Sequence, residues 1–203
     1  MKKKSNPIQL ERRQFIYVML MALVALILKF VPWVFILPRN PKFSFLRPPG
    51  TEDEDLFLDS CIRCRACANV CEAGCIQFFS LQDSATLAGT PYLDPRYRAC
   101  NLCMNCTDVC PTGALDHIIR DLDVIKKEVN MGKAIVMESN CLAFNGRICG
   151  VCHDACPVDA IALIEKSRPI VNEDKCIGCG RCEERCPQYP TAIKVRREEL
   201  TYA

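Results

Sequence analysis

Cysteine is the residue type in this sequence that most clearly points to chemistry. Sixteen of the 17 cysteines form four groups, three spaced C-x2-C-x2-C-x3-C and one spaced C-x7-C-x2-C-x3-C. The groups are Cys61, Cys64, Cys67 and Cys71; Cys100, Cys103, Cys106 and Cys110; Cys141, Cys149, Cys152 and Cys156; and Cys176, Cys179, Cys182 and Cys186. This spacing is typical of thiolates that bind 4Fe–4S clusters, where three cysteines of a run hold one cluster and the fourth reaches another. We therefore predict four 4Fe–4S clusters, with these sixteen cysteines as the iron ligands.

The residues between and after the cysteines support the same cofactor. Two residues between ligands let a tight loop present successive sulfurs to one cluster while its amides face the sulfides. A proline follows the fourth cysteine of every group except the first, and it ends any helix and turns the chain away. These prolines are Pro111, Pro157 and Pro187.

The first group departs from this pattern. Glu72 follows Cys71 where the other groups have proline, and Cys75 stands where the parallel segments have a small residue. Those small residues are Ala114, Ala160 and Ala192. We predict that Cys75 lies close to a cluster without binding it. The alternative is a shifted ligand set in which Cys75 replaces Cys71.

Structural zinc and disulfides are the alternatives to iron–sulfur clusters. Zinc sites usually take cysteines as two C-x2-4-C pairs separated by a longer stretch, whereas here they come as triplets plus one. An odd total of 17 cysteines, crowded at every third residue, does not suit ordinary disulfides. The spacing therefore favours clusters over both.

No set of side chains resembles a catalytic site. His153 lies inside the third cysteine group and His117 on a helical stretch, and neither has partners suited to catalysis. The sequence has no evident nucleophile–base pair, open metal site or nucleotide-binding loop. We predict an electron carrier without an active site of its own, acting as a subunit of an oxidoreductase complex.

Short apolar segments around the cysteine groups predict the elements that position them. Such segments precede two groups, at residues 134–137 and 169–171, and follow three groups, at residues 111–115, 157–161 and 187–193. This alternation of strand, cluster loop and helical turn predicts an α+β fold of two ferredoxin-like di-cluster modules. Residues 116–130 also have helical character.

The N-terminal part has a different character. Phe15 to Leu37 is a nearly continuous apolar run of 23 residues, interrupted by Lys29 and Pro32. As a helix with a rise of about 1.5 Å per residue it would span roughly 34 Å, and a hydrocarbon core is about 30 Å thick. No small-x-small cleavage site follows it. We predict a cytoplasmic stub and N-terminal transmembrane helix over residues 1–37, a linker over 38–55 and a four-cluster domain over 56–203.

The basic flanks of the apolar run predict its orientation. Five Lys or Arg residues precede the run and three follow it, which favours a cytoplasmic N-terminus. The pair Arg12-Arg13 looks like a twin-arginine export signal, although Glu11 stands where Ser or Thr is usual. Export in a folded state would suit a protein that receives its clusters inside the cell. The cluster domain is thus expected on the extracytoplasmic, periplasmic side, anchored in membrane lipid.

Charge is unevenly distributed along the chain. Residues 1–47 carry nine Lys or Arg and one Glu, a net charge of +8. Because the whole chain has a net charge of +2, residues 48–203 carry −6. Each oxidised cubane with four thiolates adds about −2, which would bring the cluster domain to about −14. Such a domain is expected to approach basic partner surfaces and to avoid nucleic acid.

Three segments beyond the cysteine spacing resemble the NapG/MauM type of polyferredoxin. They are Leu46-Arg47-Pro48-Pro49-Gly50, Ala88-Gly89-Thr90-Pro91-Tyr92 and Cys141-Leu142-Ala143-Phe144-Asn145-Gly146-Arg147-Ile148-Cys149. The similarity covers roughly residues 46–196. The resemblance implies an iron–sulfur accessory subunit associated with periplasmic nitrate reductase. Such a subunit passes electrons from a quinol-oxidising membrane partner to an extracytoplasmic redox enzyme or cytochrome.

We therefore expect a membrane-anchored iron–sulfur electron-transfer subunit. The alternative is the electron-transfer subunit of a molybdenum oxidoreductase of the dimethyl-sulfoxide reductase type. Resemblance to four-cluster reductase subunits implies a nested pairing of the groups, first with fourth and second with third. Cys71 would then bind with the fourth group and Cys110 with the third, while sequential pairing of consecutive groups is the competing arrangement.

Overall fold

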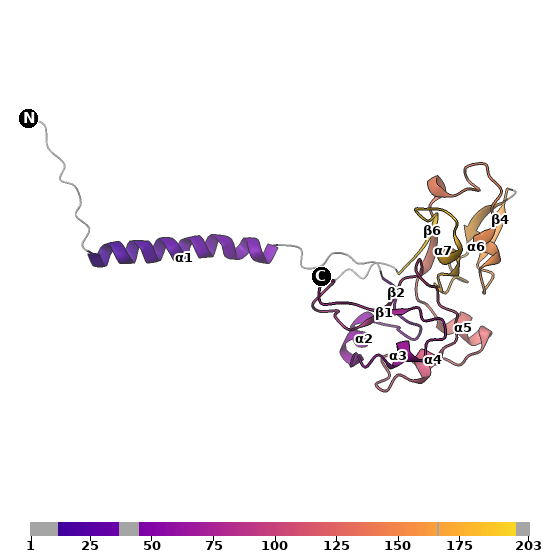
Figure 1. Ribbon diagram of the computed structural model, residues 1–203, viewed down its shortest axis with the longest axis horizontal. Coiled ribbons are helices and arrows are strands. Elements are labelled where there is room, and N and C mark those ends of the chain that lie inside the picture. The colour runs from indigo at the N-terminus through magenta and orange to yellow at the C-terminus, as the bar shows by residue number, and fades with distance from the viewer. Residues whose placement is uncertain (1–11, 37–44, 166, 198–203) are drawn as a thin grey trace, which may run out of the picture. The chain divides into compact units, whose positions relative to one another are not determined.

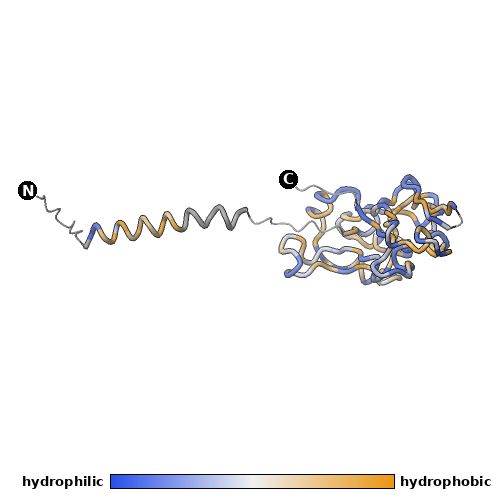
Figure 2. Tube along the Cα trace, turned by 90° about the horizontal axis from the view of Figure 1, so that it is seen from above, coloured by the Kyte–Doolittle hydropathy of each residue, from blue (hydrophilic) through white to orange (hydrophobic). Residues whose placement is uncertain are grey.

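The computed structural model describes residues 12–36, 45–165 and 167–197, without the side chains of residues 12 and 27–36. The chain divides into two units, Met1–Phe43 and Ser44–Ala203, each considered by itself. Helix α1, Arg12–Ile36, is the element of the first unit (Figure 1). Figure 2 shows apolar residues along most of its described part. Within the part of the chain that the structure describes, no helix has both the length and the apolar character required to cross a membrane.

The predicted transmembrane helix is therefore not confirmed. Leu37, at the end of the predicted span, and residues 1–11 lie outside the described residues, as do residues 38–44 of the predicted linker. The second half of that linker is part of the folded second unit. Leu46 is 2% exposed and Arg47 is fully buried, because both pack against strand β2, Pro91–Leu93. Leu46 forms a β-bridge with Leu93 of this strand.

The second unit contains two sets of short elements that follow one another along the chain (Figure 1). The first set is α2, Glu54–Ser60; α3, Ala66–Asn69; β1, Ile76–Phe78; β2; α4, Asn105–Asp108; and α5, Leu122–Glu128. The second set is β3, Lys133–Val136; the 3-10 turn η1, Glu138–Asn140; α6, Val151–Asp154; β4, Ile161–Ile164; β5, Arg168–Val171; α7, Arg181–Arg185; and β6, Ile193–Arg196. The α+β character predicted from the sequence is confirmed.

Three two-stranded antiparallel sheets organise these elements. Strand β1 pairs with β2, β4 pairs with β5, and β3 pairs with β6. The first two pairs each connect consecutive cysteine groups, because one strand follows a group and the next strand precedes the following group. The third pair closes the second set, since β3 precedes the third cysteine group and β6 follows the fourth.

Two predictions of local structure need correction. The strand expected at residues 111–115 does not form, and these residues make a turn whose Ala114 and Leu115 pack with Phe57 in a small apolar cluster. The helix expected within residues 116–130 is confined to α5. Its start is set by Asp121, whose carboxylate accepts hydrogen bonds from the amides of Asp123 and Val124 at 2.9 and 3.2 Å.

A buried arginine joins the segment before α2 to strand β2. The guanidinium of Arg47 forms an ion pair with Glu54, whose side chain is 1% exposed. Arg47 Nη1 donates to Thr90 Oγ1 at 3.0 Å and to the carbonyl of Pro91 at 2.5 Å. The guanidinium also lies 4.8 Å from the ring centre of Phe57. The buried charge of Arg47 is thus paired and hydrogen-bonded, and Leu46, Arg47 and Glu54 belong to the core and not to a connector.

Candidate iron–sulfur sites

The loops that carry the cysteines share an unusual backbone. In three of the four groups, the residues on either side of the second cysteine have a left-handed conformation with φ between 59° and 82°. They are Arg63 and Arg65 in the first group, Leu102 and Met104 in the second, and Gly178 and Gly180 in the fourth. Four of these six residues are not glycine, so the conformation is imposed against a local preference. Such turns point successive amides into one concavity, which is a common cradle for iron–sulfur clusters.

Cysteines of consecutive groups line shared pockets. Cys61, Cys64 and Cys67 of the first group lie around one pocket with Cys110 of the second, beside Phe57 and Ala114. Cys141, Cys149 and Cys152 of the third group lie around another with Cys186 of the fourth. In each pocket, three cysteines of one run are joined by the fourth cysteine of its neighbour.

The remaining eight cysteines form two further sets, each made of the triplet of one group and the fourth cysteine of its neighbour. Burial raises the pKa of Cys106, and the neighbouring thiolates of Cys100, Cys103, Cys67 and Cys71 raise it further. Burial likewise raises the pKa of Cys182, with added contributions from Cys179, Cys176, Cys152 and Cys156. Cys71 is thus near the second triplet and Cys156 near the fourth. The raised pKa values mean that these closely spaced sulfurs need a cationic centre to be thiolates together.

The nested pairing expected from the sequence is therefore wrong. Cys110 lies with the first triplet, where nesting would place Cys186, and Cys186 lies with the third triplet. The physical reason is the short antiparallel pairs β1–β2 and β4–β5, which fold consecutive cysteine groups against one another. In both pockets, cysteines of consecutive groups lie together.

The two pairs of groups also meet each other directly. The amide of Cys100 in the second group donates to the carbonyl of Cys179 in the fourth at 3.0 Å. Arg96 reinforces this contact, since its Nη1 donates to the carbonyls of Glu183 and Cys186 at 3.1 and 2.9 Å. The second and fourth groups therefore lie at the junction between the two modules, and the first and third groups lie at the ends.

Burial follows the same order. The three cysteines of each junction triplet are buried, namely Cys100, Cys103, Cys106, Cys176, Cys179 and Cys182. In the first triplet, Cys64 is exposed and the other two are half-buried, and in the third triplet Cys149 and Cys152 are half-buried. The sulfur sites thus run from one accessible end, through a buried middle, to a second accessible end.

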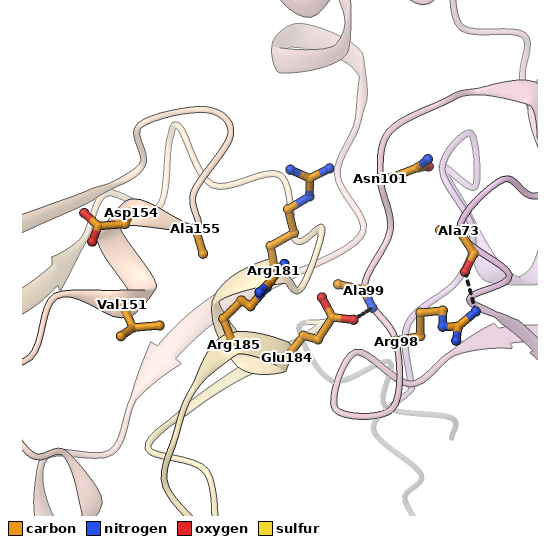
Figure 3. Close-up of a pocket in the computed structure, with 10 residues that line it drawn as sticks. All are labelled: Ala73, Arg98, Ala99, Asn101, Val151, Asp154, Ala155, Arg181, Glu184 and Arg185. Carbon is orange, nitrogen blue, oxygen red and sulfur yellow. Dashed lines mark hydrogen bonds between the residues drawn. The ribbon is translucent and has the colours of Figure 1, made fainter.

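A cleft of about 610 Å³ lies at this junction (Figure 3). Its lining comes from both modules, and each lining residue is within two positions of one of the sixteen cysteines. The lining residues are Ala73, Arg98, Ala99, Asn101, Val151, Asp154, Ala155, Arg181, Glu184 and Arg185. Two hydrogen bonds order the cleft, from Arg98 Nη1 to the carbonyl of Ala73 at 3.1 Å and from the amide of Ala99 to Glu184 Oε1 at 3.4 Å.

Cys75 occupies the place predicted for it, beside the sulfur sites. It is 1% exposed, and its Sγ lies 3.6 Å from Sγ of Cys71. Hydrogen bonding to its thiol lowers the pKa of Cys71 to about 5, and Cys75 also lowers the pKa of Cys100, the other acceptor available to its single hydrogen. Its own pKa is raised by the same two neighbours, which keeps its hydrogen in place.

The two histidines lie apart from these pockets, on the surface. His117 Nε2 lies 3.1 Å from Asp108 Oδ1, and His153 Nδ1 lies 3.0 Å from Asp154 Oδ1. Among the described residues, no group of three or more Cys, His, Asp or Glu side chains is arranged to hold a single metal ion.

These features define an iron–sulfur protein of the dicluster type. A family model described as a 4Fe-4S dicluster domain matches residues 60–114 and 147–189. The first match spans the first and second cysteine groups, and the second match spans all of the fourth group and the third group except Cys141. The division into two modules seen in the structure is therefore repeated in the family comparison.

Similar proteins then identify the family. The chain is 40% identical to the methylamine utilization ferredoxin-type protein MauM of Methylorubrum extorquens, over 76% of this chain and 74% of that protein. It is 38% identical to the ferredoxin-type protein NapG of Escherichia coli, over 74% of this chain and 69% of that protein. The chain belongs to the NapG/MauM family of ferredoxin-type proteins, as its sequence motifs predicted. It is accordingly a non-catalytic iron–sulfur electron carrier.

Proposed function

We propose that this protein is a membrane-anchored relay that carries electrons through four 4Fe–4S clusters, held by the sixteen cysteines of its four groups. The ligand sets follow the sequential pairing. Cys61, Cys64 and Cys67 bind with Cys110; Cys100, Cys103 and Cys106 bind with Cys71; Cys176, Cys179 and Cys182 bind with Cys156; and Cys141, Cys149 and Cys152 bind with Cys186. The left-handed loops and the two shared cysteine pockets support this assignment.

The hydrogen bond between Cys100 and Cys179 carries the proposal of a relay. It joins the two modules through the backbone of two ligand loops, so electrons can pass between the modules without leaving the protein. The order of transfer sites is then first group, second group, fourth group and third group. Accessible ends and a buried middle suit a carrier that meets one partner at each end.

Membrane attachment is a separate part of the proposal, carried by helix α1. Its described residues expose Phe15, Leu20 and Leu26 by 60%, 52% and 57%. Burying apolar surface of this kind contributes about 25 cal/mol per Å². The basic residues before the apolar run Phe15–Leu37 favour a cytoplasmic N-terminus, which would place the clusters on the extracytoplasmic side.

The partners follow from the family and the charge. Relatives are named for methylamine utilization and as NapG, and the family resemblance implies a quinol-oxidising membrane donor and an extracytoplasmic reductase or cytochrome acceptor. The acidic cluster domain favours partners with basic docking surfaces. The competing proposal, an electron-transfer subunit of a molybdenum oxidoreductase, predicts a molybdenum-containing subunit in the purified complex.

Anaerobic purification of the full chain tests the cluster assignment. We expect about sixteen iron and sixteen acid-labile sulfide atoms per chain, and broad visible absorption that bleaches on reduction. A colourless protein with about four zinc ions would contradict it.

Fractionation tests the anchor. We expect high salt to leave the protein in the membrane and detergent to release it. A protease added outside sealed, right-side-out vesicles should reach the cluster domain. Release by salt alone would refute the anchor, and protection from the protease would place the clusters in the cytoplasm.

A further inference from the structure

The side chain of Cys75 is the feature of the sulfur sites that the ligand assignment leaves without a role. The same offset, four residues after the last cysteine of a group, is occupied by Ala114 after the second group and by Ala160 after the third. Both alanines are buried, by 93% and 98%, like Cys75 itself. The backbone surroundings are therefore equivalent, and Cys75 differs from the alanines by one thiol.

In three of the cysteine groups, the fourth cysteine accepts the same kind of backbone hydrogen bond. The amide of Ala160 donates to Sγ of Cys156 at 3.3 Å, and the amide of Ala192 donates to Sγ of Cys186 at 3.4 Å. The amide of Cys75 is likewise a hydrogen-bond donor to Cys71. The thiol of Cys75, with Sγ 3.6 Å from Sγ of Cys71, adds a further donor that alanine cannot supply in the other cysteine groups.

This extra donor lies beside one proposed ligand set. Cys75 Sγ contacts Sγ of Cys71, and Cys75 also lowers the pKa of Cys100; both cysteines belong to the set proposed for the second cluster. Cys100 is also the residue whose amide contacts Cys179 across the module junction. The added thiol therefore acts at the point where electrons would cross from one module to the other.

We propose that the Cys75 thiol donates its hydrogen to Sγ of Cys71, a ligand proposed for the second cluster, and raises the reduction potential of that cluster. The reduced cluster carries one more negative charge than the oxidised cluster, so a donor to its sulfurs stabilises the reduced form more. The second cluster thereby becomes easier to reduce than it would be with alanine. This inference rests on the ligand sets proposed above.

Replacing Cys75 separates its role from that of a ligand. In the full chain, we expect Cys75→Ala to retain the iron content of the wild type and to shift one of the four midpoint potentials downward, with the other three unchanged. Cys75→Ser keeps a donor and should restore most of the lost potential. The measurement is a redox titration followed by electron paramagnetic resonance.

Ala160→Cys tests the effect of the thiol in the opposite direction, by adding one where the protein has alanine. Ala160→Cys places a thiol at the equivalent position beside Cys156, where the amide of residue 160 already contacts the sulfur. We expect it to raise one different midpoint potential, that of the cluster held by the fourth triplet. This variant keeps the test decisive if Cys75→Ala proves too unstable to purify.

Distinct results would overturn the inference and the function. Unchanged potentials in both Cys75→Ala and Ala160→Cys would refute the role of the thiol while leaving the relay intact. Loss of one cluster from Cys75→Ala, together with a full cluster content in Cys71→Ala, would make Cys75 the ligand instead. Absence of clusters from the wild-type protein would refute the proposed function itself.

Discussion

The amide of Cys100 and the carbonyl of Cys179 form a 3.0 Å hydrogen bond that links the second and fourth cysteine groups. Each of these two groups thus has a neighbour within its own module and a neighbour in the other module. The triplets of the first and third groups each share a pocket with the last cysteine of the other group in their module. The four sites form an open chain, with two end positions and two inner positions.

This order predicts a difference between end and inner ligands in the reduced protein. Paramagnetic clusters that lie close together broaden one another's resonance. Cys103→Ser, which removes an inner cluster, should therefore alter the signals of two remaining clusters, whereas Cys64→Ser should alter the signal of one. Electron paramagnetic resonance of fully reduced samples measures this, and equal effects of the two variants would contradict the open chain.

The sequential ligand sets predict which substitutions act on the same cluster. Cys110→Ser should perturb the same signal and midpoint potential as Cys64→Ser, because both residues line one pocket. Cys71→Ser should instead act on the cluster perturbed by Cys103→Ser. A redox titration of each single variant identifies the affected cluster. Grouping of Cys110→Ser with Cys149→Ser would restore the nested arrangement.

Gly178 gives a prediction about the close packing of the fourth cysteine loop against the segment that contains Gly132. It has φ of 77°, and a Cβ atom there would lie 2.5 Å from the backbone nitrogen of Gly132. Gly178→Ala should therefore cost more than the roughly 1–2 kcal/mol of a left-handed backbone and should lose one cluster. Gly146→Ala is the matched control, because its φ is 79° and no atom lies within 4 Å of the added Cβ. Iron content and chemical unfolding measure both, and equal losses would contradict the close packing.

Substitution of Arg47, which is not a cluster ligand, is expected to have a large effect on the free energy of unfolding. Arg47→Ala removes the hydrogen-bonded partner of the buried Glu54 carboxylate and leaves Arg197 Nη1, 3.9 Å away, as its cation, and we expect a loss of about 3–5 kcal/mol in the free energy of unfolding. Arg168→Ala is the comparison, since its pair with Glu165 is exposed and should contribute about 0–1 kcal/mol. Denaturation by guanidinium chloride, followed by circular dichroism and visible absorbance, gives both values. A small effect of Arg47→Ala would mean that the buried network is not structural.

The sequence predicted the chemistry of the sites better than their arrangement. Cysteine spacing identified the ligand loops, because a cubane restricts the distance between successive thiolates. Pairing between groups depends on β1–β2 and β4–β5, and strand β1, Ile76–Phe78, is too short to be distinguished by its pattern. The role of Arg47 was missed for a related reason. Arginine among prolines is typical of an exposed connector, and only the position of Glu54 and three aromatic rings shows that it is buried.

The approach of Gly132 to Gly178 also concerns how this protein could have been assembled from smaller parts. The segment between the modules runs beneath the fourth cysteine loop, where the amide of Met131 donates to the carbonyl of Ile177 at 3.0 Å and Lys133 Nζ donates to the carbonyl of Cys176 at 2.7 Å. The connection is thus itself part of the second module's core, with Val129 and Met131 both buried. Although each module resembles a small ferredoxin, cutting the chain at this connection would remove packing from a ligand loop. The connection therefore belongs to the second module, and a fragment of that module without it is not expected to fold as an independent two-cluster carrier.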